Sequence, residues 1–179
     1  MPKTFAFLRA INVGGHTVTM ADLKTRFQEL GLRGVETFIA SGNVVFEAGR
    51  AGEASLAARL EAHLEAKLGF PVAVFLRSGA ELTTLVAGCP YDAAEQAEAR
   101  AMNVIFLQAP LTKAQTARLR DLETAEDDFR FHGREVWWRC RTKQSQSAFS
   151  NAVFEKTLGL KATFRGLPTL QRLVAKHLS

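Results

Sequence analysis

Residue types suited to anion binding gather in two short glycine-containing segments near the start of the chain. The first, residues 8–16, follows an apolar stretch and leads into a helix-like pattern, and the second, residues 41–43, is a turn. A strand that runs into a glycine pair leaves backbone N–H groups free at the start of a helix, where a phosphate or carboxylate can be held. The candidate ligand-binding residues are Arg9, Asn12, Gly14, Gly15, Ser41, Gly42 and Asn43.

Within this set Arg9 has the clearest chemistry, because its planar guanidinium pairs well with phosphate and carboxylate groups. His16, in the same segment, is a weak candidate for a general acid or base. The competing interpretation is structural: the glycines supply the positive φ that a turn needs, and Ser-Gly-Asn is common in hairpins. The sequence has no nucleophile elbow, P-loop or dinucleotide-binding pattern, so it identifies no reaction.

A second candidate region is the most basic stretch of the chain. If it forms a strand, alternation sets Trp137, Arg139, Arg141 and Lys143 on one face, a mixture of ring and cations that suits single-stranded nucleic acid. The aromatic RNA-binding consensus of RRM domains is absent. The alternative is that these charges lie on a solvated edge strand, where they oppose aggregation.

Metal binding and redox chemistry find little support. The acidic run at Glu123 and 126–128 has no oxygen-ligand pattern, and the four histidines have no paired spacing. Cys89 and Cys140 are far apart and form no CxxC motif, which is typical of inert thiols in a reducing compartment. We therefore expect no metal and no cofactor.

Composition sets broad bounds on the protein class. The chain has 179 residues, 47% of them hydrophobic, enough for one domain or two small ones in contact. A net charge of +5 favours acidic partners such as nucleic acid or phosphorylated metabolites. No signal peptide and no run near the ~20 apolar residues of a membrane span is present, so we expect a cytoplasmic protein without a membrane partner.

The first half of the chain predicts the order β-α-β-β-α-β, the split βαβ or ferredoxin-like unit. Strands are expected at residues 4–10, 35–40, 44–47 and 71–77, and helices run from Met20 to Gly31 and from about Leu56 to Gly69. Phe5, Phe7 and Arg9 alternate with Ala6 and Leu8, as in a half-buried strand. A short helix begins at the capping box 78–81 and ends at Cys89-Pro90.

After a charged, alanine-rich segment at 91–100, which reads as a linker, the same order of elements begins again. The expected strands are 102–107, 129–132, 136–140 and 161–164, with helices from about 112 to 122 and 150 to 158, and a final helix carries Leu170 to Leu178. The repeat is one of element order, without matching residues. We predict an α+β fold of two ferredoxin-like halves, 1–90 and 91–179, packed as one compact unit.

Several motifs together resemble a mainly bacterial, uncharacterised family, domain of unknown function 1697. They are LRAINVGG at 8–15, MADL at 20–23, SGNVVF at 41–46, NAVFEK followed by LG at 151–159, and Ala162-Thr163 ahead of Arg165. The resemblance covers nearly the whole chain. It implies a cytosolic α+β protein of two intertwined subdomains and no established activity. The chain departs from the family pattern at Ala148 and at Gly166 to Pro168, where relatives carry a lysine, asparagines and a tryptophan.

Two functions of different classes follow from these residues. In the split βαβ unit the loop after the first strand and the 41–43 turn lie at the same end of the sheet, so their residues should converge. The leading hypothesis is a module that binds an anionic small molecule or single-stranded nucleic acid there. The alternative is an enzyme acting on a phosphorylated or carboxylated metabolite, with Arg9 and Asn12 as anchors and His16 as proton donor.

Overall fold

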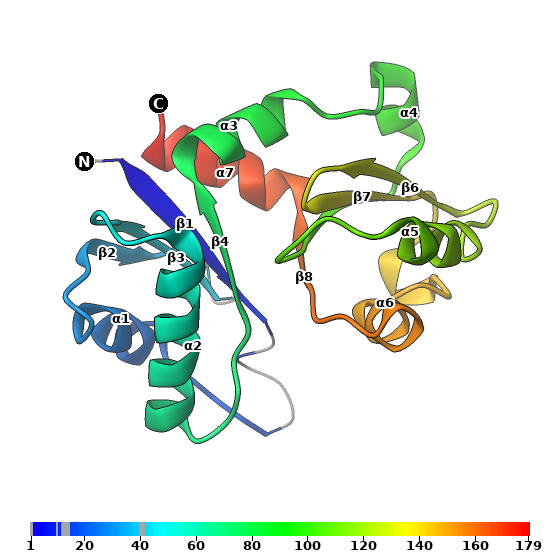
Figure 1. The fold of residues 1–179 in the computed structure, drawn as a ribbon. Coiled ribbons are helices and arrows are strands. Elements are labelled where there is room, and N and C mark those ends of the chain that lie inside the picture. Colours follow the sequence, from blue (N-terminus) through cyan, green and yellow to red (C-terminus); the bar gives the residue numbers. More distant parts are fainter. Residues whose placement is uncertain (1, 10, 12–14, 40–41) are drawn as a thin grey trace. The chain divides into compact units, whose positions relative to one another are not determined.

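The structure is a computed structural model, which describes residues 2–9, 11, 15–39 and 42–179. Its backbone contacts divide it into two units, residues 1–83 with Leu178, and residues 84–177 with Ser179. The boundary predicted after residue 90 lies within the second of these units. Each unit carries one four-stranded antiparallel sheet (Figure 1), which confirms an α+β fold of two ferredoxin-like halves.

The first half has the predicted β-α-β-β-α-β order. Its elements are β1 (Lys3–Leu8), α1 (Met20–Gln28), β2 (Arg33–Thr37), β3 (Asn43–Glu47), α2 (Glu53–Leu68) and β4 (Val74–Ser78). The strands lie in the order β2-β3-β1-β4, with β1 antiparallel to both of its neighbours. This order is that of the split βαβ unit, in which β3 is inserted between the two parallel strands β1 and β2.

The helices α1 and α2 cover one face of this sheet (Figure 1), and the core of the first half lies between them and the strands. Ala6 and Leu8 of β1 face this core, where they meet apolar helix residues such as Phe27 and Leu60. The prediction of a half-buried β1 is wrong, because Phe5 and Phe7 on the other face are buried as well. A central strand with two buried faces needs an almost continuous apolar run.

The second half repeats the element order after two helices. Its elements are α3 (Gly79–Ala87), which begins in the first unit, α4 (Ala93–Glu98), β5 (Ala101–Phe106), α5 (Lys113–Arg120), β6 (Asp127–His132), β7 (Glu135–Cys140), a 3₁₀ turn η1 (Gln144–Gln146), α6 (Asn151–Leu158), β8 (Thr163–Gly166) and α7 (Leu167–His177). The strand order, β6-β7-β5-β8, matches that of the first sheet.

The core of the second half is rich in aromatic rings. Trp138 of β7 lies edge-on to the ring of Phe149, with ring centroids 4.9 Å apart, and Phe154 of α6 packs against Phe149 and Phe164. Edge-to-face pairs of this kind add to the stabilisation that burial alone supplies. This core lies on the face of the sheet that α5 and α6 cover (Figure 1).

The segment predicted as a linker, residues 91–100, is instead ordered around α4. Asp92 and Glu95 form a reciprocal capping box, in which each side chain accepts a hydrogen bond from the other residue's backbone N–H. Tyr91 is buried and ties the segment to β6. The alanine and charged residues of this segment are typical of a linker, but they are also compatible with a short capped helix that tertiary contacts stabilise.

Candidate functional site

The two predicted ligand-binding segments of the first half lie at one end of the same sheet. The backbone N–H of Leu8, the last residue of β1, donates to the carbonyl oxygen of Gly42 at 2.9 Å. The next residue, Arg9, donates its own N–H to the carbonyl of Ala73, just before β4, at 3.0 Å. The end of β1 and the turn before β3 therefore lie at the same end of the sheet, as predicted, and Arg9 follows β1 directly with a half-buried side chain. Convergence of the loop side chains on the turn stays a prediction.

Gly42 and Asn43 have structural duties at this end of the sheet. Gly42 is buried with φ +80°, and a Cβ there would lie 3.1 Å from the Cβ of Leu8. Asn43 is 1% exposed, and its Nδ2 donates to the carbonyl of Phe38 at 2.9 Å, which closes the β2–β3 connection. These two residues shape the turn, so any ligand would meet this turn through other groups.

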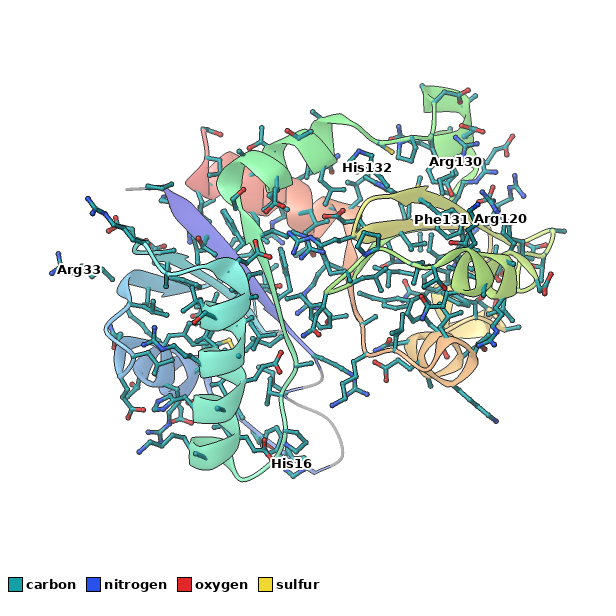
Figure 2. The ribbon with its side chains drawn as sticks, viewed as in Figure 1. His16, Arg33, Arg120, Arg130, Phe131 and His132 are labelled. Carbon is teal, nitrogen blue, oxygen red and sulfur yellow. The ribbon has the colours of Figure 1, made fainter. Side chains whose placement is uncertain are left out.

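Gly15 and His16 stand on the solvent side of the loop. Gly15 has φ +84° with open space around it, as a loop glycine in the left-handed region does. The exposed ring of His16 stacks on Phe70, with centroids 4.0 Å apart, just after α2 (Figure 2). The remaining predicted site residues, Asn12, Gly14 and Ser41, lie outside the described residues.

The basic stretch of the second half does not form the expected strip of one ring and three cations. Trp137 and Arg139 share a face of β7, but they are 1% and 3% exposed. Arg141 and Lys143 come after the end of β7, with Arg141 half-buried and Lys143 exposed. The alternative of a solvated edge strand is also wrong, since β7 pairs with both β5 and β6. A base has no access to the indole of Trp137 in this structure.

Arg139 is held by an acid from the neighbouring strand. Asp128 of β6 lies directly opposite, and its two oxygens accept from Nε and an Nη of Arg139 at 3.0 and 2.8 Å. This bidentate hydrogen bonding raises the pKa of Arg139, although burial opposes it. The guanidinium also lies over the ring of Tyr91, 5.1 Å from its centroid. Arg139 therefore fixes the sheet to the segment before α4.

Tyr91 is the centre of a polar cluster that sequence reasoning missed. Arg130 lies over its ring at 4.2 Å and bridges to Glu95 of α4, with an Nη to Oε1 distance of 2.5 Å. Burial and then the charge of Asp128 raise the pKa of Tyr91, which keeps the phenol protonated at neutral pH. The arginines of the cluster form ion pairs with its carboxylates, Arg130 with Glu95 and Arg139 with Asp128, so the cluster stabilises the fold. Figure 2 shows Arg130 on β6 near Phe131, whose ring lies under Arg120.

Residues of the acidic run, Glu123 and Asp127, accept hydrogen bonds from neighbouring parts of the second half. Asp127 is 2% exposed and accepts from the indole N–H of Trp138 at 2.8 Å and from the hydroxyl of Ser147 at 2.7 Å. Among the described residues no group of three His, Cys, Asp or Glu side chains is arranged to hold a metal ion. Burial raises the pKa of the Cys140 thiol, which disfavours the reactive thiolate. No helix of the described chain has the length and apolar character to span a bilayer.

Comparisons with known proteins define a family and a fold. A family model described as a protein of unknown function, DUF1697, matches residues 1–137. A solved structure, that of the conserved bacterial protein SP0830 from Streptococcus pneumoniae, is similar with a TM-score of 0.79 and 23% sequence identity. The match covers 100% of this chain and 99% of that chain. At this identity the likeness shows the fold alone. No curated protein matches the chain significantly.

Proposed function

This chain belongs to the DUF1697 family, whose description names no activity, and from its geometry we propose that it binds a small anion at the end of the first sheet. The proposed site is the loop after β1 together with the turn before β3, with Arg9 as the main side-chain partner and Gly14, Gly15, Asn12 and Ser41 as further contributors. The hydrogen bond from Leu8 N–H to the Gly42 carbonyl carries the proposal, because it joins the two segments beside Arg9.

Two further features support an anion rather than a neutral ligand. Arg9 is half-buried, so its charge is partly shielded from bulk water. A charge-assisted hydrogen bond at such a partly shielded site is worth more than one at a fully solvated site. Gly15 has a positive φ, and successive N–H groups near such a residue form a concave surface that attracts anions. Phosphate and carboxylate are the groups that fit this chemistry.

We do not extend the proposal to catalysis. His16 is the proton donor of the enzymatic alternative, and the contact that holds its ring is the stack on Phe70. That contact orients the imidazole, and among the described residues no carboxylate or hydroxyl is hydrogen-bonded to it, as general acid–base chemistry needs. Whether the anion is free or part of a nucleic-acid backbone is decided by the experiment below.

The test is isothermal titration calorimetry with inorganic phosphate and, separately, with a short single-stranded oligonucleotide at several salt concentrations. Arg9→Ala should weaken binding by about 1.5–3 kcal/mol, the usual worth of a hydrogen bond to a charged group. Arg33→Ala is the matched control, since Arg33 is an exposed arginine of the same half that points outward from β2 (Figure 2).

Equal losses in the two variants would mean that the chain attracts anions through its net charge alone, and the proposal would fail. Binding of phosphate without binding of the oligonucleotide would identify the ligand as a small molecule. An oligonucleotide that binds with a steep salt dependence, removed by Arg9→Ala, would identify a nucleic-acid backbone instead.

A further inference from the structure

A pocket of about 440 Å³ lies within the second half, between the start of β5, the 3₁₀ turn η1 and the start of α7. Its size falls in the range of pockets that hold small organic ligands. No residue predicted from the sequence as part of a site lines this pocket. It is independent of the loop proposed above for anion binding, which belongs to the first half.

Two hydrogen-bonded carboxamides, those of Asn103 and Gln144, are among the residues that line the pocket. Asn103, a polar residue in an otherwise apolar stretch of β5, is 5% exposed, and its Nδ2 donates to the Oε1 of Gln144 at 3.0 Å. Within the described chain, neither the Oδ1 of Asn103 nor the Nε2 of Gln144 has a hydrogen-bond partner. The Asn103 Oδ1 and the Gln144 Nε2 are therefore open to a ligand. If O and N are exchanged in both amides, the open atoms become the Asn103 Nδ2 and the Gln144 Oε1, again one donor atom and one acceptor atom.

The Asn103 acceptor and the Gln144 donor can each bind a polar group of a nucleobase, because base edges carry both donors and acceptors. Asparagine and glutamine side chains recognise bases by giving one hydrogen bond and accepting another along such an edge. The apolar residues Leu167 and Pro168 line the same pocket and supply surface for a flat ring. A ligand that satisfies both polar atoms at once gains most from this pocket, because a polar atom left without a hydrogen bond when a ligand covers it costs binding free energy.

The pocket also has a cation. Arg100 lines it with an exposed side chain, while its backbone N–H is fixed by a 2.8 Å hydrogen bond to the carbonyl of Cys140. In the part of the chain that the structure describes, its guanidinium has no hydrogen bond or ion pair. It is therefore available to a phosphate, the group with which a guanidinium pairs in a bidentate manner.

We propose that this pocket binds a nucleoside monophosphate, with the base edge on Asn103 and Gln144 and the phosphate on Arg100. The inference goes beyond the proposed anion site, because it assigns a second ligand site and a ligand class. Gly166 offers a way to block it. A Cβ on Gly166 would lie 4.0 Å from the Asn103 Oδ1 and 3.7 Å from the nearest atom of Pro168, an ordinary contact distance, and the φ of Gly166 is not in the left-handed region. A longer side chain there should fill the pocket without straining the backbone.

The experiment is calorimetric titration of the full chain with the monophosphates of adenosine, guanosine, cytidine and uridine, each beside its nucleoside and inorganic phosphate. We expect at least one monophosphate to bind more tightly than its nucleoside and than phosphate. Arg100→Gln should cost about tenfold or more in affinity for that monophosphate and leave nucleoside binding unchanged. Gly166→Leu should abolish binding of the monophosphate and of its nucleoside. Arg118→Gln, at another exposed arginine of the second half, is the matched control and should change nothing.

Circular dichroism of each variant confirms that it is folded before its affinity is compared. The proposal is overturned if no monophosphate binds at millimolar concentration, or if binding survives in both Arg100→Gln and Gly166→Leu. Arg9→Ala separates the two sites: it should remove phosphate binding to the first half and leave the monophosphate affinity of this pocket intact. A monophosphate whose binding is lost in Arg9→Ala alone belongs to the first site and also overturns the inference.

Discussion

Arg77 in β4 and Arg165 in β8 occupy equivalent positions in the two sheets. Each lies two residues before the helix that follows its strand, and each is buried, at 1% and 7% exposure. In both, an Nη donates to the carbonyl of the preceding residue, Leu76 at 2.7 Å and Phe164 at 2.8 Å. The prediction of a repeat without matching residues is therefore wrong at this position, where the two halves share a buried arginine.

The register of the two sheets supports this correspondence. In the first sheet Arg77 pairs with Phe5 of β1, and Phe5 pairs on its other side with Val45 of β3. In the second sheet Arg165 pairs with Val104 of β5, and Val104 pairs on its other side with Trp137 of β7. Burial lowers the pKa of Arg165 to about 10, which still leaves its guanidinium charged at neutral pH. A buried charge is costly unless hydrogen bonds satisfy it, and the short bonds to backbone carbonyls serve that purpose.

Tyr91 should resist ionisation in the folded protein. It is the single tyrosine of the chain, so tyrosinate absorbance near 295 nm reports it alone. Because its pKa is raised in the folded state, its contribution to stability is complete below the ordinary pKa of about 10 and is lost as the pH rises above it. We expect tyrosinate to appear only together with unfolding, and Tyr91→Phe to flatten the loss of stability above pH 10. A normal titration in the folded chain would contradict the burial of this ring.

The buried ion pair of Asp128 with Arg139 should contribute far more to the free energy of unfolding than the exposed acid Glu98 nearby. Asp128→Ala leaves the 3%-exposed Arg139 without its bidentate partner, and we expect the free energy of unfolding to fall by about 3 kcal/mol. Glu98→Ala removes an acid whose side chain is 63% exposed and whose Oε2 lies 3.5 Å from Arg141 and, at the distance limit of an ion pair, 3.9 Å from Arg139. It should cost less than about 1 kcal/mol. Urea unfolding of both variants makes the comparison, and equal losses would show that Asp128 is not a buried partner.

Two glycines of the first half should respond differently to alanine. Both have positive φ, so each substitution costs about 1–2 kcal/mol of backbone strain. At Gly42 the new Cβ would in addition lie 3.1 Å from Leu8 and 3.2 Å from Ile11, whereas at Gly15 it would meet nothing within 4 Å. Thermal unfolding should therefore show a larger loss for Gly42→Ala than for Gly15→Ala. The reverse order would mean that Gly42 is not enclosed by the loop after β1.

The fluorescence of the two tryptophans should not change when nucleic acid is added. Trp137 and Trp138 are the only tryptophans, and each is 1% exposed. Acrylamide and iodide should therefore quench the fluorescence of the folded chain weakly, and a single-stranded oligonucleotide should not quench it at all, because stacking needs an open ring face. Strong quenching by the oligonucleotide, saturating with concentration, would restore the basic strand as a nucleic-acid surface.

The order of secondary structure was determined by the sequence itself, because its signals are local. Apolar periodicity marked both β-α-β-β-α-β passes, and the capping box at Ser78–Glu81 forms as predicted. Gly69 and Gly159 end α2 and α6 in the left-handed region, as a glycine after an amphipathic helix indicates. The same local order, with the rules of the split βαβ unit, correctly brought the two loops of the first sheet to one end.

Only the tertiary structure decided which polar residues are buried and what they meet. Whether Arg139 faces water depends on which elements cover its face of the sheet, and its partner Asp128 is set by the register of a different strand. Strand alternation puts Trp137 and Arg139 on one face but says nothing of what covers that face. Asn103 and Gln144, which both line the pocket, are 41 positions apart, so their pairing has no local signature beyond a polar residue in an apolar strand.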